Sequence, residues 1–72
     1  MKIDKVRYVL EVCEKFRVKF THNGKPHTFI YDAVGNTIKF YDDRFAVWYT
    51  GDNSIPLIEV DYSDVNSIED LR

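Results

Sequence analysis

The sequence is poor in several residue types, and each shortage excludes a class of protein. One Cys among 72 residues allows neither an internal disulfide nor a multi-Cys zinc site, so the core must form without covalent help. No long uninterrupted apolar run is present, which argues against a transmembrane helix or an export signal. The net charge of −2 gives no general nucleic-acid signal. These shortages predict a protein with no membrane partner, and the lone Cys predicts a cytoplasmic location.

Aromatic residues, by contrast, are abundant. The chain holds five Phe, five Tyr and one Trp, and 44% of its residues are hydrophobic, which argues against disorder. A chain of this length buries only about 60% of the surface that its unfolded form exposes, so its core is thin. No repeat or linker interrupts the sequence. We therefore predict that residues 1–72 form a single small β-rich domain.

Apolar and polar residues alternate over residues 15–21, a period of two that indicates a half-buried strand. The pair Asn23-Gly24 follows it and predicts a tight hairpin, because both central positions of such a turn need positive φ. The resulting register pairs Phe20 with His27, Val18 with Phe29, Phe16 with Tyr31, and Lys15 with Asp32.

Three further turns are predicted downstream, at Gly35-Asn36, at Asp42-Asp43 and over residues 51–54. A last strand is expected over about residues 55–62. The turn at Gly35-Asn36 would set Ala33 against Ile38, Tyr31 against Phe40, and Asp32 against Lys39. The turn at Asp42-Asp43 would pair Phe40 with Phe45 and Ile38 with Val47.

The two ends of the chain carry different signals. Ser63 precedes apolar residues spaced by three, Val65, Ile68 and Leu71, which predicts a short capped helix. Residues 4–14 fit either a strand, through continued alternation, or a helix capped by Asp4. The predicted fold is mainly β: an antiparallel meander of four or five strands forming a curled sheet or small barrel, with a short C-terminal helix. The alternative is an α+β fold with a helix at 4–14 packed on the sheet.

The segment from Ile58 to Glu69 resembles the closing segment of small β-barrel modules of the Sm-like, SH3-like and bacterial PH-like types. These modules often end with a strand, a polar turn and a short element like Val65-Asn66-Ser67-Ile68. The resemblance covers about a dozen residues and implies barrel geometry with a binding or assembly role. It assigns no functional residue.

Catalytic and metal-binding patterns are weak. His22 and His27 flank a turn without an evident third ligand, Cys13 has no clear orienting partner, and Asp42-Asp43 suits a turn. None of the common nucleotide-binding, zinc-protease or serine-hydrolase motifs occurs. We therefore predict that the protein is not an enzyme and uses no metal or cofactor.

The distribution of charge is more informative than its sum. Residues 1–27 hold seven Lys or Arg against three acids, whereas residues 28–72 hold three against nine. This asymmetry and the surplus aromatics predict a module that binds another protein or itself, including as a homo-oligomer. The alternative is a nucleic-acid-binding small barrel with a basic and aromatic sheet face. The candidate binding residues are Lys15, Arg17, Lys19, Lys39, Tyr41 and Trp48.

Overall fold

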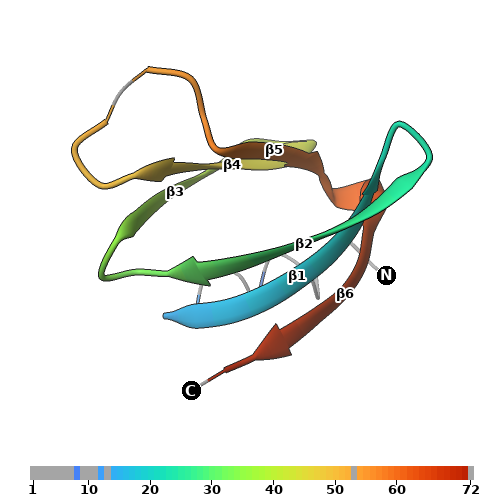
Figure 1. Cartoon of the computed structure of the whole chain (residues 1–72), viewed down its shortest axis with the longest axis horizontal. Helices are drawn as coiled ribbons and strands as arrows, with labels where there is room; N and C mark the ends of the chain where they lie inside the picture. Colours follow the sequence, from blue (N-terminus) through green and yellow to red (C-terminus); the bar gives the residue numbers. More distant parts are fainter. Residues whose placement is uncertain (1–7, 9–11, 13, 53, 72) are drawn as a thin grey trace.

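The computed structural model describes residues 8, 12, 14–52 and 54–71, and these form mainly β structure in two layers (Figure 1). Six strands are present in the described part of the chain, with a 3-10 turn before the last of them. Their bounds are β1 Lys15–His22, β2 Lys25–Asp32, β3 Asn36–Phe40, β4 Arg44–Tyr49, β5 Ile58–Asp61, η1 Tyr62–Asp64 and β6 Val65–Asp70.

One layer is a three-stranded antiparallel sheet in the order β2-β1-β6, and the other is a three-stranded antiparallel sheet in the order β3-β4-β5. No ladder between described strands closes these sheets into a continuous barrel. The predicted mainly antiparallel β fold is therefore confirmed, while the closed form of the small barrel is not observed.

The first hairpin forms as its turn chemistry predicts. Asn23 and Gly24 have φ of 52° and 76°, the positive values that a tight two-residue turn requires. The β1–β2 register pairs Lys15 with Asp32 and Phe16 with Tyr31, and it continues to His22 opposite Lys25. The third turn is also correct, since Phe40 faces Phe45 and Ile38 faces Val47 between β3 and β4.

The predicted hairpin at Gly35-Asn36 is wrong, because β2 and β3 lie in different sheets. At the turn between β2 and β3, the Asp32 Oδ1 atom accepts a hydrogen bond from the Val34 amide at 3.0 Å. The Gly35 amide donates to the Asp32 carbonyl at 3.0 Å, and the Thr50 amide donates to the Gly35 carbonyl at 3.2 Å. These bonds turn the chain from one sheet into the other, so Asp32 does not pair with Lys39.

The predicted C-terminal helix is also wrong, because Val65–Asp70 is strand β6. A bulge between β1 and β6 explains the misleading spacing: Phe20 pairs with Val65, whereas its neighbour Lys19 pairs with Ser67. The extra residue lets Val65 and Ile68 both pack on the core although they are three apart. A helical spacing can therefore arise in a strand that contains one bulge.

Residues 4–14 lie largely outside the described part of the chain, and so does Cys13. Of the three described residues of that range, Tyr8 and Val12 have helical backbone and Glu14 lies in a bend. The choice between strand and helix for the whole of 4–14 thus stays open.

The core lies between the two sheets. Phe16 and Tyr31 stack with their ring centroids 4.8 Å apart, and Phe45 stacks on Tyr62 at 6.1 Å. Of the six Phe and Tyr residues in the predicted strand pairs, four are buried, and Phe29 and Phe40 pack against the core partly buried. The buried cluster comprises Phe16, Val18, Phe20, Tyr31, Phe45, Val47, Val60, Tyr62 and Val65.

Candidate functional site

The basic candidates on β1 lie on the outer face of the β2-β1-β6 sheet. Lys15, Arg17 and Lys19 alternate with the buried residues of this strand, so they point away from the core. Arg17 pairs with Glu69 across the β1–β6 ladder, with its Nη1 atom 2.8 Å from the Glu69 Oε2 atom. Part of the basic charge on this face is therefore already balanced by an acid on the neighbouring strand.

Two of the other candidates, Lys39 and Trp48, belong to the β3-β4-β5 sheet. Lys39 and Trp48 lie on the outer face of this sheet, because their neighbours Ile38 and Val47 pack in the core. Tyr41 follows β3, and its ring is covered by the Arg44 guanidinium, whose carbon lies 4.5 Å from the ring centroid.

Five of the six predicted binding residues thus divide between the outer faces of two sheets that sandwich the core, and the sixth, Tyr41, follows β3 (Figure 1). The structure brings Lys15, Arg17 and Lys19 together, and separately brings Lys39 close to Trp48. It does not assemble all six on one surface. Whether any of them binds a partner stays a prediction.

A groove of about 460 Å³ lies where the end of the β1–β2 hairpin meets the chain leading into β5. Phe20 contributes to it from β1, and Leu57 and Ile58 contribute from the opposite side. Ile55, which is 86% exposed, and Leu57, 38% exposed, place apolar surface beside the groove. The lining residues are Phe20, His22, His27, Ile55, Pro56, Leu57, Ile58 and Glu59.

Both histidines belong to this groove. The His27 ring stacks on Phe20 with centroids 5.5 Å apart, and it meets the His22 ring edge-on at 5.9 Å. Their rings therefore extend the apolar floor of the groove toward the hairpin turn. Among the described residues, no group of three or more His, Cys, Asp or Glu side chains is placed to hold a metal ion.

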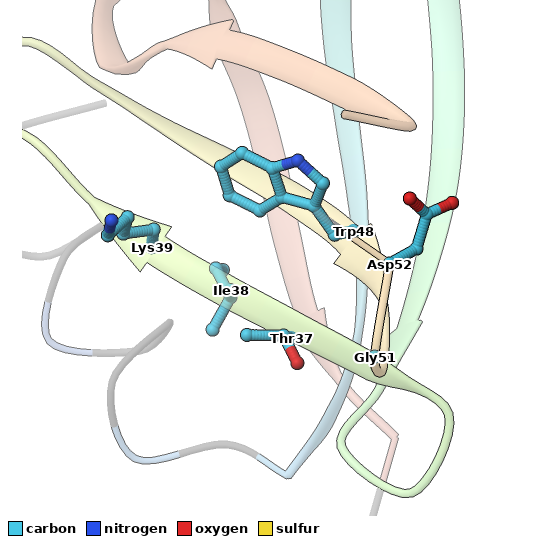
Figure 2. A pocket seen from close by; sticks show the side chains of 6 residues that line it. All are labelled: Thr37, Ile38, Lys39, Trp48, Gly51 and Asp52. Atoms are coloured by element: carbon cyan, nitrogen blue, oxygen red, sulfur yellow. The ribbon is translucent and has the colours of Figure 1, made fainter. Parts of the chain in front are cut away.

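A second pocket, of about 370 Å³, lies on the outer face of the β3-β4-β5 sheet beside Trp48 (Figure 2). It is lined by Thr37, Ile38, Lys39, Trp48, Gly51 and Asp52. Lys39 stands near one end of the indole and Asp52 near the other, so the aromatic ring lies between opposite charges (Figure 2).

Ser54 fixes both Trp48 and Asp52. Its carbonyl oxygen accepts a hydrogen bond from the Trp48 Nε1 atom at 3.3 Å. Its amide and hydroxyl donate to the Asp52 Oδ1 atom at 2.9 and 2.6 Å. The hydrogen bonds from Ser54 lower the pKa of the Asp52 carboxyl below its ordinary value of 3.8, so this group is anionic at neutral pH.

Gly51 shapes the turn that carries Asp52. Its φ of 85° lies in the left-handed region, where a side chain is strained. The Asp52 amide closes the turn by donating to the Tyr49 carbonyl at 3.0 Å. The pocket therefore rests on a strand and a closed turn.

Sequence reasoning identified Lys39 and Trp48 but missed Asp52, Ser54 and Ile55 as site residues. The Asp-Asn-Ser run over residues 52–54 predicts a turn, and a serine two residues after an aspartate often donates to its carboxylate. No local signal distinguishes Ile55 from a core residue, because its exposure depends on the tertiary fold.

Comparison with known proteins adds no relative: no family model matches the chain, and no curated protein or solved structure matches it significantly. Within the described ranges, we find no helix whose length and apolar character would let it cross a membrane.

Proposed function

We propose that this protein is a non-enzymatic binding or assembly module that uses the groove between the β1–β2 hairpin and residues 55–59 to contact another protein or a second copy. The observation that carries the proposal is the apolar surface of Ile55 and Leu57 beside a groove floored by Phe20. Contiguous apolar surface of this kind marks interaction sites on small soluble domains.

Burial of this surface supplies a driving force for association. A fully buried Ile or Leu side chain gains about 1.5–3 kcal/mol relative to an exposed one. Ile55 is exposed and Leu57 is partly exposed, so a partner that covers both side chains gains a large part of this free energy from each of them. The entropic cost of association is then subtracted from that gain. Phe20 contributes shape rather than new burial, because it is already buried in the core.

The backbone beside the groove favours an extended partner. Among the described strands β5 pairs only with β4, so its other edge has no strand neighbour. An extended segment can align along such an edge and place alternate side chains toward the groove. Pro56, just before the strand, carries no amide proton and limits this pairing to β5 itself.

The alternative, nucleic-acid binding through a single basic and aromatic face, has less support from the geometry. Lys15, Arg17 and Lys19 face away from the core on one sheet, while Lys39 and Trp48 face away from it on the other. A single strand of RNA or DNA would have to wrap around the domain to contact all five.

The test compares Ile55→Asp with Val34→Asp. Val34 is 91% exposed at the corner between β2 and β3 and does not line the groove, so it is a matched control. Self-association is measured by sedimentation over a concentration series. Binding to a second protein is measured with extended peptides selected from a displayed library, and their contacts are mapped by NMR.

We expect Ile55→Asp to weaken association at least tenfold and Val34→Asp to leave it unchanged. A strict monomer that also selects no peptide at this groove would refute the proposal. Equal effects of the two substitutions would likewise refute the groove as the binding surface.

A further inference from the structure

The Trp48 pocket on the outer face of the β3-β4-β5 sheet is lined by an aromatic ring and two groups of opposite charge. Trp48 is held through its Nε1 atom by the Ser54 carbonyl, and the same residue orients the Asp52 carboxylate. The indole is only partly buried and lines a pocket of about 370 Å³, within the usual range for small-molecule sites. A fixed aromatic ring facing a pocket is a stacking platform.

Two opposite charges mark the ends of this platform. Lys39 pairs with Ala46 on β4, whereas Asp52 lies in the turn that closes on Tyr49. Ala46 and Tyr49 are three positions apart on β4, so Lys39 and the turn that carries Asp52 are offset by roughly 10 Å along the strand at about 3.3 Å per residue. Figure 2 shows Lys39 and Asp52 at opposite ends of the indole.

The Asp52 carboxylate retains capacity to accept hydrogen bonds. An ionised carboxylate accepts about four of them. Ser54 supplies two, both to the Oδ1 atom. The two remaining acceptor positions lie on the Oδ2 atom, which is therefore available to the N–H donors of a ligand.

We propose that the Trp48 pocket binds a guanine nucleotide, with the base stacked on the Trp48 indole, its N1–H and N2–H groups donating to Asp52, and its phosphate near Lys39. Guanine presents two adjacent donors on its Watson–Crick edge, whereas adenine, cytosine and uracil each place an acceptor there, which a carboxylate repels. A 5′ phosphate lies at the far end of the nucleotide from that edge, as Lys39 lies at the far end of the indole from Asp52.

An amino acid is a poorer fit to the same charges. In an amino acid with an uncharged side chain, the ammonium and carboxylate groups are attached to one carbon, so they cannot reach both ends of the indole. A purely apolar ligand would leave both Lys39 and Asp52 unused. A nucleotide has a flat ring that stacks on Trp48, N–H groups that donate to Asp52 and a distant phosphate for Lys39. It therefore uses all three groups of the site.

This site is independent of the protein-binding groove. The two pockets have no lining residue in common, so either can fail without the other. A guanine base reaches such a site either in a free mononucleotide or in a guanosine within single-stranded RNA. The experiment distinguishes these two ligands.

The experiment titrates the protein with GMP, AMP and guanosine and follows Trp48, the single Trp of the chain, by fluorescence corrected for nucleotide absorbance and by its indole N–H NMR signal. We expect GMP to shift both signals, to bind at least tenfold more tightly than AMP, and to bind more tightly than guanosine at low salt. Parallel titrations use a uridine oligoribonucleotide with and without one internal guanosine. Tighter binding of the guanosine oligomer than of GMP assigns the site to RNA, and the reverse assigns it to the free nucleotide.

Two substitutions test the assigned roles. Asp52→Asn keeps an acceptor for Ser54, and we expect it to abolish the preference for GMP over AMP, with Asp64→Asn as the matched control. Lys39→Gln is expected to remove the advantage of GMP over guanosine, with the exposed Lys19→Gln as its control. Unchanged Trp48 signals with millimolar GMP, equal affinity for GMP and AMP, or full discrimination by Asp52→Asn would each overturn the proposal.

Discussion

Replacing Tyr62 with Phe tests how the two sheets are joined. Tyr62 begins η1, the turn through which the chain passes from β5 in one sheet to β6 in the other. Its side chain is 1% exposed, its ring stacks on Phe45, and its hydroxyl donates to the Tyr41 carbonyl at 2.9 Å. The Tyr62→Phe substitution keeps the ring and removes only the hydroxyl.

The expected loss follows from that hydrogen bond. A protein hydrogen bond contributes about 0.5–1.5 kcal/mol net, and an acceptor left unsatisfied in the interior costs about 1–3 kcal/mol. Tyr41 is only partly buried, so water can solvate its carbonyl in part, and the lower half of that range applies. We expect the free energy of unfolding to fall by about 1–2 kcal/mol, from a total of roughly 4–11 kcal/mol for a domain of this size.

The assay is urea unfolding followed by circular dichroism, with Tyr49→Phe as the control. Tyr49 is 60% exposed, so loss of its hydroxyl should change the free energy of unfolding by less than about 0.5 kcal/mol. Thermal unfolding should show the same contrast, with a melting temperature lowered by roughly 5–15 °C in Tyr62→Phe. If the two variants are equally stable, the Tyr62 hydroxyl does not anchor η1 to the end of β3, and the reasoning is refuted.

Two further predictions concern turns. Gly24→Ala should lower the free energy of unfolding by about 1–2 kcal/mol, because φ is positive at this position. Gly35→Ala, where φ is not positive, should have little effect. Urea unfolding compares the two variants, and equal losses of stability would contradict the turn geometry. The Asp52 pKa is lowered in the folded state, so its stabilising contribution is present above the unfolded pKa and is lost as the pH falls through the folded pKa, below 3.8. Ser54→Ala should raise the Asp52 pKa toward 3.8 in a carboxyl NMR titration, and a wild-type value at or above 3.8 would exclude this effect.

Local turn chemistry made part of the fold predictable from the sequence. Asn23-Gly24 admits one tight turn, and the alternation on both sides then fixes every pair from His22 opposite Lys25 to Lys15 opposite Asp32. A slip by one residue would expose the apolar face of the hairpin, which makes this register strongly specified. The pairing of β3 with β4 was predictable for the same reason.

The two errors share a cause, because each depends on contacts between residues distant in sequence. The residues after β2 predict a turn but not the direction in which the chain leaves it. The hydrogen bond from the Thr50 amide to the Gly35 carbonyl helps set that direction. The bulge that brings Val65 and Ile68 to one side exists only because β6 pairs with β1, about 45 residues earlier in the chain. Spacing within a segment carries no information about such a partner.

The same distinction explains what sequence reasoning could say about function. Alternation correctly indicates that Lys19 and Lys39 each point away from the core, but it does not say whether their strands belong to one sheet. Because the chain changes sheets after β2, the basic residues of β1 and the Lys39–Trp48 pair face outward from different layers. The sheet change separates Trp48 from the basic strand β1, while the turn that follows β4 places Asp52 beside it. The predicted basic and aromatic face is thus replaced at Trp48 by a platform with a cation at one end and an anion at the other, and this polarity is what favours a guanine nucleotide.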